Sequence, residues 1–383
     1  MNKTPDFMRL ALALARHGYG VTSPNPMVGA VLVNKGEIIG RGWHRRAGMP
    51  HAEIEALRAA QQRKKNPRGA TLYVTLEPCS THGRTPPCTD AIIASGIRKV
   101  ITGATDPNPK HAGNAFKILR RAGIEVIHGT FAQECERLNE AFNHWIVHGT
   151  PFVTVKAAMT LDGKIAAASG ESKWITGEKA RGAGMQMRQG ADAVLVGVNT
   201  ILADNPSLTF RPKHDGNART QPKPLRRIIL DSMARTPLEA KVVCDKFAAL
   251  TTIVVSRAAP KKRISALGKR ANILAAPLCE PLSSDNRSLL DLRWLMKRLG
   301  SENVTSILVE GGGETNASFL FNGLAQRVAF FYAPRLLGGS RSLKAVAGEG
   351  VKDVADAIRL EDVEWKKVGE DLMMTARVGL GRD

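Results

Sequence analysis

The segments "HAEIEAL" (residues 51–57) and "TLEPCSTHGRTPPC" (residues 75–88) bring a histidine, a carboxylate and two cysteines together within one short part of the chain. Taken singly, these residues have ordinary interpretations: a helix start, a surface acid and two buried thiols. Proline precedes or closely flanks both His51 and Cys88, which predicts that each of them opens a helix. Two predicted helix N-termini thus carry the reactive side chains.

Helices and strands alternate on either side of these segments through the first 147 residues. Hydrophobic alternation predicts strands, including a hairpin closed by a turn at residues 34–36. Amphipathic runs predict helices; the first begins near Asp6 and the last runs through Glu140. The expected strands lie within residues 27–44, 70–76, 98–104 and 124–129, and the expected helices between them lie within 51–63, 86–96 and 114–123. This pattern predicts an α/β sheet with helices packed on both sides.

The stretch "HGTP" (148–151) is short and turn-forming, and a fresh strand follows it. We expect it to separate a domain of residues 1–147 from a domain of residues 151–383, because 383 residues exceed what one core usually serves. Strand-rich segments again alternate with helices in the second domain, within 152–160, 191–202, 226–232, 250–256, 271–276, 304–322 and 327–334. The stretch 209–226, rich in Pro, Lys and Arg, predicts a long surface loop.

The first constellation fits a catalytic zinc site. Zinc deaminases show H-x-E followed by P-C-x-x-C; here His51, Glu53 and Cys79 match, but the second cysteine, Cys88, comes nine positions later. Three protein ligands leave a fourth position for water, and two helix N-termini favour thiolates over thiols. The pattern predicts that His51, Cys79 and Cys88 bind Zn²⁺ and that Glu53 is the catalytic proton carrier.

The residues inserted between the cysteines, "STHGRTPP" (80–87), bear on the substrate. A deaminase acting on a bare base has no need of an arginine and several hydroxyls here, whereas a phosphorylated substrate would use Arg84 as a forked donor. A solvated loop charge is the alternative for Arg84.

These motifs, with "PNPMVGAVLV" and "DPNP", resemble the deaminase half of the bifunctional riboflavin-biosynthesis deaminase–reductases. The resemblance implies a cytidine-deaminase-like α/β/α domain that deaminates a diaminohydroxypyrimidine carrying a phosphoribosylamino group. It carries the zinc ligands over to the same histidine and cysteines, the proton shuttle to Glu53, and a pyrimidine contact to Asn25. The chain departs from the family at Thr81, where the family usually has a histidine; here the histidine comes one place later, at His82.

The resemblance continues through "KAAMTLDGKIA" (156–166), "GESKWIT" (170–176), "ADAVLVGVNTILADNPSLTFR" (191–211) and "VEGGGET" (309–315). It implies a dihydrofolate-reductase-like α/β domain in which NADPH reduces the ribosyl side chain to ribityl by hydride delivery to C1′. The positions matched for NADPH are Ala158, Trp174, Thr200, Asp204, Ser232, Gly312, Gly313, Glu314, Thr315, Asn316, Ala317 and Ser318. The positions matched for substrate are Ser172, Arg188, Leu208, Arg211 and Glu310, with Lys156 and Asp204 as further candidates for polarising the sugar.

The residues of this second half give a weaker signal by themselves. The segment 306–322 predicts a strand, three glycines and a helix, and backbone amides at such a helix start bind phosphate. The spacing is not G-x-G-x-x-G, so an ordinary strand–helix turn stays open as an alternative. Likewise, Trp174 alone would suit a core aromatic, and Asp204 with its neighbours an ordinary turn.

Charge and composition limit the partners. The net charge of +20 suggests an anionic partner, but Lys and Arg exceed Asp and Glu in both halves, by 20 against 11 in residues 1–147 and by 35 against 24 in the remainder. With aromatic residues at only 5%, this even spread favours a pyrimidine ribose phosphate and NADPH over nucleic acid. The alternative functions are deamination of RNA and a non-catalytic scaffold with structural zinc. The lengthened spacing between Cys79 and Cys88 disfavours RNA deamination. Structural zinc would need a fourth protein ligand, and only three good candidates are present.

The remaining features are those of a cytoplasmic protein. No apolar run reaches membrane-spanning length, and the "LALALA" run near the start lacks a signal-peptide context. Five scattered cysteines make no disulfide framework, and Cys135, Cys244 and Cys279 suit small buried hydrophobes. A homo-oligomer stays open.

Overall fold

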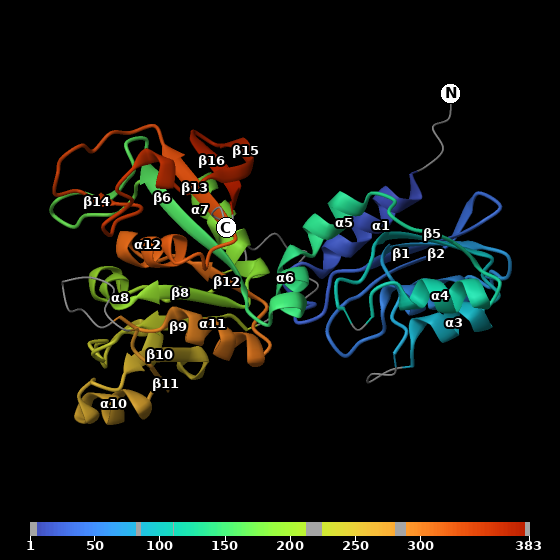
Figure 1. Ribbon diagram of the computed structural model, residues 1–383, viewed down its shortest axis with the longest axis horizontal. Coiled ribbons are helices and arrows are strands. Elements are labelled where there is room, and N and C mark those ends of the chain that lie inside the picture. Colours follow the sequence, from blue (N-terminus) through green and yellow to red (C-terminus); the bar gives the residue numbers. More distant parts are fainter. Residues whose placement is uncertain (1–5, 82–85, 110, 212–223, 280–288, 380–383) are drawn as a thin grey trace. The chain divides into compact units, whose positions relative to one another are not determined.

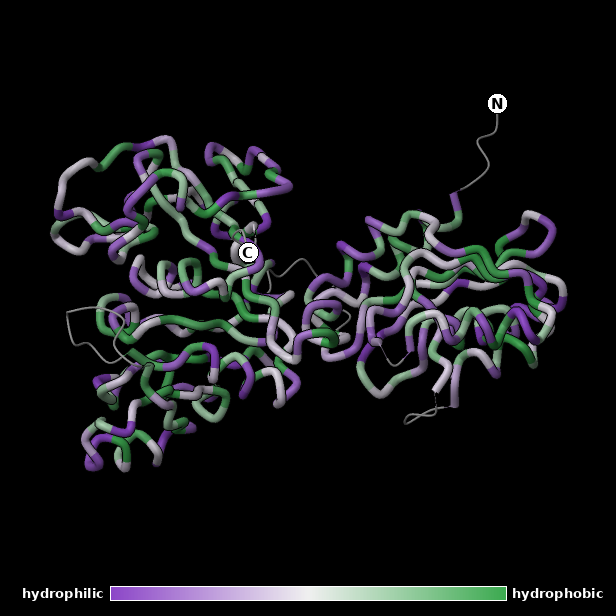
Figure 2. The backbone as a smooth tube through the Cα atoms, in the orientation of Figure 1, coloured by the Kyte–Doolittle hydropathy of each residue, from purple (hydrophilic) through white to green (hydrophobic). Residues whose placement is uncertain are grey.

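The computed structural model describes residues 6–81, 86–109, 111–211, 224–279 and 289–379. The chain divides into two compact units that meet between Gly149 and Thr150, here called unit 1 (the N-terminal part) and unit 2 (the C-terminal part). Figure 1 shows helices against a sheet in each. In both units the hydrophobic segments follow the central strands, while loops and outer helices are more polar (Figure 2).

Unit 1 contains a five-stranded sheet in the order β2-β1-β3-β4-β5. The strands are β1 (Gly29–Asn34), β2 (Glu37–Trp43), β3 (Thr71–Leu76), β4 (Lys99–Ala104) and β5 (Glu125–Ile127). β1 is antiparallel to β2 and β3, whereas β3, β4 and β5 are parallel. The predicted hairpin turn between β1 and β2 is confirmed: Lys35 and Gly36 both adopt positive φ, at 49° and 82°, as a two-residue hairpin turn of the primed type requires.

Helices cover both faces of this sheet, as predicted. One core contains side chains of α2 (Ala52–Gln62), α3 (Cys88–Ala94) and α4 (Asn114–Arg121). The other contains side chains of α1 (Phe7–Ala15) and α5 (Ala132–Leu138). Glycines let α2 lie directly on β2: a Cβ at Gly42 would come within 2.3 Å of the Ala52 carbonyl oxygen. This close packing fixes the start of α2, where His51 lies.

The last helix of unit 1 differs from the prediction. Two helices take its place, α5 and α6 (Glu140–His148), and the second extends beyond Glu140 up to the linker. The break falls at Asn139, whose buried side chain accepts from Met27 N at 2.8 Å and donates to Met27 O at 2.9 Å. An amide committed to a distant loop in this way holds Asn139 out of the regular helix, at φ −114°.

Unit 2 contains a nine-stranded sheet in the order β11-β10-β9-β8-β12-β6-β13-β16-β15. Its strands are β6 (Phe152–Thr160), β8 (Ala193–Gly197), β9 (Arg226–Leu230), β10 (Thr251–Ser256), β11 (Asn272–Ala276), β12 (Ser306–Val309), β13 (Arg327–Ala333), β15 (Leu360–Val368) and β16 (Asp371–Val378). All pairs are parallel except β13–β16 and β16–β15, which are antiparallel. β7 (Lys164–Ala166) and β14 (Leu343–Lys344) form a small separate pair.

The helices of unit 2 lie mainly between parallel strands in the sequence, as the alternating pattern predicted. They are α7 (Glu178–Gly190), α8 (Val198–Asp204), α9 (Lys241–Cys244), α10 (Lys261–Gly268), α11 (Leu292–Ser301) and α12 (Gly313–Phe321). Two cores result, one with α11 and α12 and the other with α8 to α10. Most of the predicted surface loop 209–226 lies outside the described residues.

Two of the smaller predictions can be compared directly. Cys135 is buried, but Cys244 and Cys279 are exposed, so the prediction of buried thiols is wrong for those two. Their places at the end of α9 and beyond β11 put both at the margin of the core. Among the described residues, none of the helices combines the length and apolarity needed to cross a membrane.

Candidate functional site

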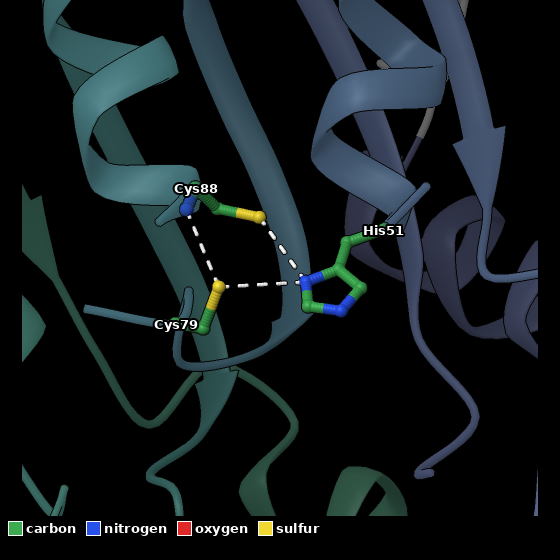
Figure 3. A group of neighbouring side chains, drawn as sticks. All are labelled: His51, Cys79 and Cys88. Carbon is green, nitrogen blue, oxygen red and sulfur yellow. Dashed lines mark hydrogen bonds between the residues drawn. The ribbon is translucent and has the colours of Figure 1, made fainter. Parts of the chain in front are cut away.

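The predicted zinc ligands converge in unit 1. His51 is the N-cap of α2, Cys79 follows β3, and Cys88 is the first residue of α3. Figure 3 shows His51 Nδ1 facing both sulfurs, at 3.4 Å from Cys79 Sγ and 3.3 Å from Cys88 Sγ. Ligands around a tetrahedral zinc lie about 3.5 Å apart, given zinc–ligand distances of about 2.0–2.3 Å. The three atoms therefore fit one metal ion.

The electrostatics of the two thiols also favour a cation. Hydrogen bonds from Cys88, including its backbone N–H at 3.3 Å, and from His51 lower the pKa of Cys79 to about 4. The neighbouring Cys79 and burial raise the pKa of Cys88. One thiolate thus forms readily, and a second beside it needs a compensating positive charge. A divalent cation bound by both sulfurs supplies that charge.

Glu53 lies in the first turn of α2 and is only 3% exposed. Burial raises its pKa to about 6, although the positive charge of His51 acts in the opposite direction. Its Oε2 is buried and has no hydrogen-bond partner among the described residues. A buried carboxyl group with a pKa near neutrality and a free oxygen is suited to exchange protons with a substrate or a water molecule.

His44, which sequence reasoning missed, completes this side of the site. It is 2% exposed, its Nε2 lies 3.1 Å from Asn25 Nδ2, and its ring meets the His51 ring edge-on at 5.3 Å. Its Nδ1 lies 3.1 Å from the Pro50 carbonyl oxygen, and burial lowers its pKa. The contact with Asn25 connects the predicted pyrimidine-binding residue to the metal site. A polar residue directly after a strand was the available signal.

Glu77, in "TLEPC", was also missed. Its buried carboxylate accepts three backbone N–H groups, from Asp106 at 3.1 Å, Gly113 at 2.9 Å and Ala115 at 3.0 Å. It thereby fixes the "DPNP" loop beside the cysteines, and Cys79 is close enough to contribute to the raised pKa of Asp106, which is chiefly caused by burial. Thr81 is exposed, and the substrate contact predicted for Arg84 lies outside the described residues, as does His82.

In unit 2, three predicted substrate residues lie together. Glu310 follows β12, and Arg188 on α7 donates to it from Nε at 3.1 Å and from Nη2 at 2.5 Å. Although burial alone would raise it, the charges of Arg188 and Lys156 hold the pKa of Glu310 below its ordinary value. Nη1 of Arg188 donates to the Thr209 carbonyl at 3.1 Å. The guanidinium is thus engaged by the Glu310 carboxylate and the Thr209 carbonyl.

A second group surrounds the end of α8. Ser172 donates to Asp204 Oδ1 at 3.1 Å, and Lys173 lies 3.6 Å from the same oxygen. Trp174 is 64% exposed, with the Arg181 guanidinium 4.6 Å from its ring centroid, so the core interpretation of this tryptophan is wrong. An exposed indole beside these polar residues is available to a ligand.

The glycine segment before α12 is the place suited to a dinucleotide. Gly312 is the N-cap of α12, with no side-chain cap, and a Cβ built on it would meet only open space. Gly197 and Gly311 have the opposite role: a Cβ on either would collide with Thr315, at 2.7 Å or less. The start of α12 therefore offers backbone N–H groups at a helix N-terminus and open space beside Gly312, while Thr315 packs closely against Gly197 and Gly311. Such a helix start is suited to bind a phosphate group of a cofactor.

The members of the predicted NADPH run differ in orientation. Asn316 and Ala317 are buried, and Asn316 donates to the Ala345 carbonyl at 2.8 Å, so its side chain holds the helix to the following loop. Glu314, Thr315 and Ser318 are more accessible. The other predicted positions are dispersed: Ala158 on β6, Thr200 on α8, Ser232 after β9, and Leu208 and Arg211 after α8, with Leu208 buried and Arg211 exposed.

Two family models match the chain. Residues 1–104 match the cytidine and deoxycytidylate deaminase zinc-binding region, and residues 151–374 match the RibD C-terminal domain. The first includes the three zinc ligands and Glu53, and the second includes all the predicted positions of unit 2.

Relatives match nearly the full length. Riboflavin biosynthesis protein RibD of Actinobacillus pleuropneumoniae is 42% identical over 96% of this chain and 94% of its own, and that of Escherichia coli (strain K12) is 39% identical over 96% and 97%. Among solved structures, Acinetobacter baumannii RibD is 34% identical with a TM-score of 0.84, covering 98% of both chains. The Thermotoga maritima diaminohydroxyphosphoribosylaminopyrimidine deaminase/5-amino-6-(5-phosphoribosylamino)uracil reductase is 36% identical with a TM-score of 0.80, covering 97% of this chain and 98% of its own.

Proposed function

This chain belongs to the RibD family of bifunctional riboflavin-biosynthesis deaminase–reductases, and from that membership we propose how its own residues divide the two reactions. Unit 1 contains the zinc-dependent deaminase and unit 2 the reductase, which implies NAD(P)H as cofactor. The substrate is a pyrimidine ribose phosphate.

In the deaminase, His51, Cys79 and Cys88 would hold the zinc, whose positive charge would make a water molecule acidic enough to act as the nucleophile. Glu53 would accept the proton of that water on its carboxylate and deliver it to the leaving amine. The observation that carries this role is the buried, unpartnered Oε2 of a carboxyl group whose pKa is raised to about 6. Asn25, oriented by His44, binds the pyrimidine edge.

In the reductase, NADPH would be the source of the hydride that reduces the ribosyl group at C1′. The start of α12 and the exposed Trp174 bind the cofactor. Lys156, held beside the Arg188–Glu310 pair, supplies positive charge near the reacting sugar, because Glu310 and Arg188 balance each other and leave the Lys156 ammonium in excess. Arg211, exposed after α8, binds the substrate phosphate.

The finer choices among cofactor, partner and location complete the proposal. NADPH rather than NADH, the absence of a nucleic-acid substrate, and a cytoplasmic location remain predictions of the sequence. We further propose that residues 1–147 and 151–383 are separable domains. The support is that each unit has its own sheet, cores and candidate site, and that the chain divides between Gly149 and Thr150.

The experiment that tests the function uses the diaminohydroxypyrimidine ribosyl phosphate as substrate. Without NADPH, we expect ammonia and a product in which an amine has become a carbonyl. With NADPH, the same product should accumulate two further hydrogens, and NADPH should be consumed in equal amount. Ammonia release that requires RNA instead of this small molecule would contradict the proposal.

A further inference from the structure

Arg227 on β9 has no part in the proposed function, and its side chain is completely buried. Asp245, the C-cap of α9, accepts from its Nη1 at 2.7 Å and from its Nη2 at 2.9 Å. The same two nitrogens donate to two backbone carbonyl groups, Nη1 to that of Ser207 at 3.0 Å and Nη2 to that of Val242 at 2.9 Å. The guanidinium therefore connects an ion pair to a segment outside α9, at Ser207.

Ser207 lies in what we call the substrate loop, residues 205–211, which carries the predicted substrate residues Leu208 and Arg211. The Leu208 side chain is only 3% exposed and packs in a core of unit 2, so its backbone is the part that remains for a substrate. The Leu208 N–H has no hydrogen-bond partner among the residues that the structure describes. This N–H is therefore a donor that the loop can offer to an oxygen of the substrate.

Arg227 determines the direction of that N–H. The Ser207 carbonyl and the Leu208 N–H belong to one peptide group, and the bond between the two residues is trans. In a planar trans peptide group, the C=O and N–H bonds point in opposite directions. Because Arg227 holds the carbonyl on its own side, the N–H points away from the buried guanidinium.

The backbone of Leu208 also needs support. Its φ is 50°, in the left-handed region that residues with a Cβ rarely adopt. Such a conformation persists only where its surroundings fix it. Arg227 holds the carbonyl of the residue before Leu208, and Arg188 holds the carbonyl of the residue after it, Thr209, at 3.1 Å. The two arginines thus fix the loop on both sides of Leu208.

We propose that Arg227 is a positioning residue of the reductase. Together with Asp245 it fixes the Ser207–Leu208 peptide group, so that the Leu208 N–H donates to an oxygen of the ribose phosphate substrate. The inference rests on the proposed function, because it takes residues 205–211 to bind that substrate. Arg188 shares the site directly through its ion pair with Glu310, whereas Arg227 acts through the peptide group that it holds.

Arg227→Lys tests this role in steady-state kinetics of the full chain with the deaminated pyrimidine ribose phosphate. Lysine keeps the charge but replaces the planar fork by one nitrogen, which cannot occupy the places of both Nη atoms. We expect KM for the pyrimidine substrate to rise at least about tenfold, and KM for NADPH to change less than about twofold. Deamination should be unchanged. A variant that is only less stable has fewer folded molecules, which lowers kcat and leaves KM unchanged.

Arg226→Lys is the matched control. Arg226 is the neighbouring arginine of β9, but its side chain is half-exposed and pairs with Glu302 at 2.7 Å. This exchange removes an arginine fork from the same strand and leaves the Ser207 carbonyl bound. Both KM values should therefore stay within about twofold of wild type.

A double variant tests whether Arg227 acts through the loop. Arg211→Ala removes another contact of the same loop and should raise KM for the pyrimidine substrate about tenfold in the wild-type background. In the Arg227→Lys background it should raise KM at most about threefold, because the displaced loop no longer places Arg211 correctly. Residues that act independently would multiply their effects.

Asp245→Asn provides a milder variant, since Asp245 is 26% exposed and the change keeps its size. It removes the charge that holds the guanidinium and should raise the same KM about threefold. With an active wild type, a KM that neither Arg227→Lys nor Asp245→Asn changes overturns this inference alone. A fall in kcat without a rise in KM, or effects of Arg211 and Arg227 that multiply fully, overturns it as well. A wild type that fails to reduce the substrate contradicts the proposed function, and the inference falls with it.

Discussion

The two units build their sites in different ways. In unit 1, the metal ligands and the proposed proton carrier come from two short segments, and two of the ligands stand at the starts of helices. In unit 2, the candidate residues are spread over β6, α7, α8, the segment after β12 and α12, and much of the cofactor cradle is backbone. Metal chemistry demands particular side chains at particular positions, whereas hydride transfer mainly requires that two ligands be placed correctly.

The sharpest test of unit 1 is removal of one ligand. Cys88→Ser should abolish tight zinc binding and deamination together, because two remaining ligands do not hold the ion and a serine hydroxyl stays protonated. Metal analysis after dialysis measures it, and Cys244→Ser, at an exposed thiol of unit 2, is the matched control. Full zinc content in the Cys88 variant would show that the ligand set is wrong.

The next effect separates proton transfer from metal binding. Glu53→Gln keeps size and shape but cannot carry a proton, so deamination should fall by about 10²–10⁴-fold while zinc content and reduction remain. Glu55→Gln is the control, since Glu55 shares the first turn of α2 but forms ion pairs with Arg45 and Arg58. Equal ammonia release by the Glu53 variant and wild type would end the assigned role.

In unit 2 we expect stability rather than chemistry to respond first. Arg188→Ala leaves the buried Glu310 charged and unpaired, which should destabilise unit 2 by about 3–5 kcal/mol. Arg226→Ala removes a similar but more exposed ion pair with Glu302, so it should lower the free energy of unfolding by about 1 kcal/mol or less. Denaturant midpoints of unfolding, followed by circular dichroism, compare the two. Similar midpoints in both variants would show that burial of the Arg188 pair is not what matters.

A smaller change is expected at the phosphate. Arg211→Ala should raise the KM of the reductase step by about tenfold, the loss of one charge-assisted contact, and leave deamination unchanged. Retention of the chain on RNA at low salt should hardly change, since it depends on the summed charge and vanishes near physiological salt. If the wild type binds RNA at physiological salt and the Arg211 variant does not, the proposal is contradicted and a nucleic-acid substrate is favoured instead.

The smallest expected effect is a loss of stability at acidic pH that depends on His144. Burial, with a contribution from His148, lowers the pKa of His144 on α6 to about 4. Between pH 6.5 and 4 the unfolded chain therefore binds a proton that the folded chain excludes, so stability is complete above pH 6.5 and falls with pH. The shift amounts to about 1–2 kcal/mol at pH 5 after allowing for partial solvent exposure. His144→Asn should lose less stability than wild type from pH 7 to pH 5; equal losses would contradict this.

How much the sequence could predict depends on the range of each interaction. The helix starts and the hairpin turn follow from neighbouring residues, and they were predicted. The zinc ligands, up to 37 positions apart, were predicted because each segment carries a motif of its own, His51 with Glu53 and Pro78 with Cys79. The hydrogen bonds of three other residues were not predicted. Glu77 bonds to a residue up to 38 positions away, Asn139 to one 112 positions away and Arg188 to one 122 positions away. Nothing near these residues in the sequence marks the partner. The solvent exposure of a side chain could not be predicted from its neighbours in the sequence either. Trp174 and Cys244 lie at the surface although their residue types favour the core.

The bond between Asn139 and Met27 has a consequence for synthesis. It joins the loop that carries Asn25 to a residue 112 positions later, almost at the end of unit 1. The metal ligands have all left the ribosome when residue 88 emerges, but this loop cannot be fastened until residue 139 has followed. Domains generally fold as units during translation. A nascent chain can therefore acquire its three metal ligands well before the loop that carries Asn25 is secured, so metal capture should precede the fastening of that loop.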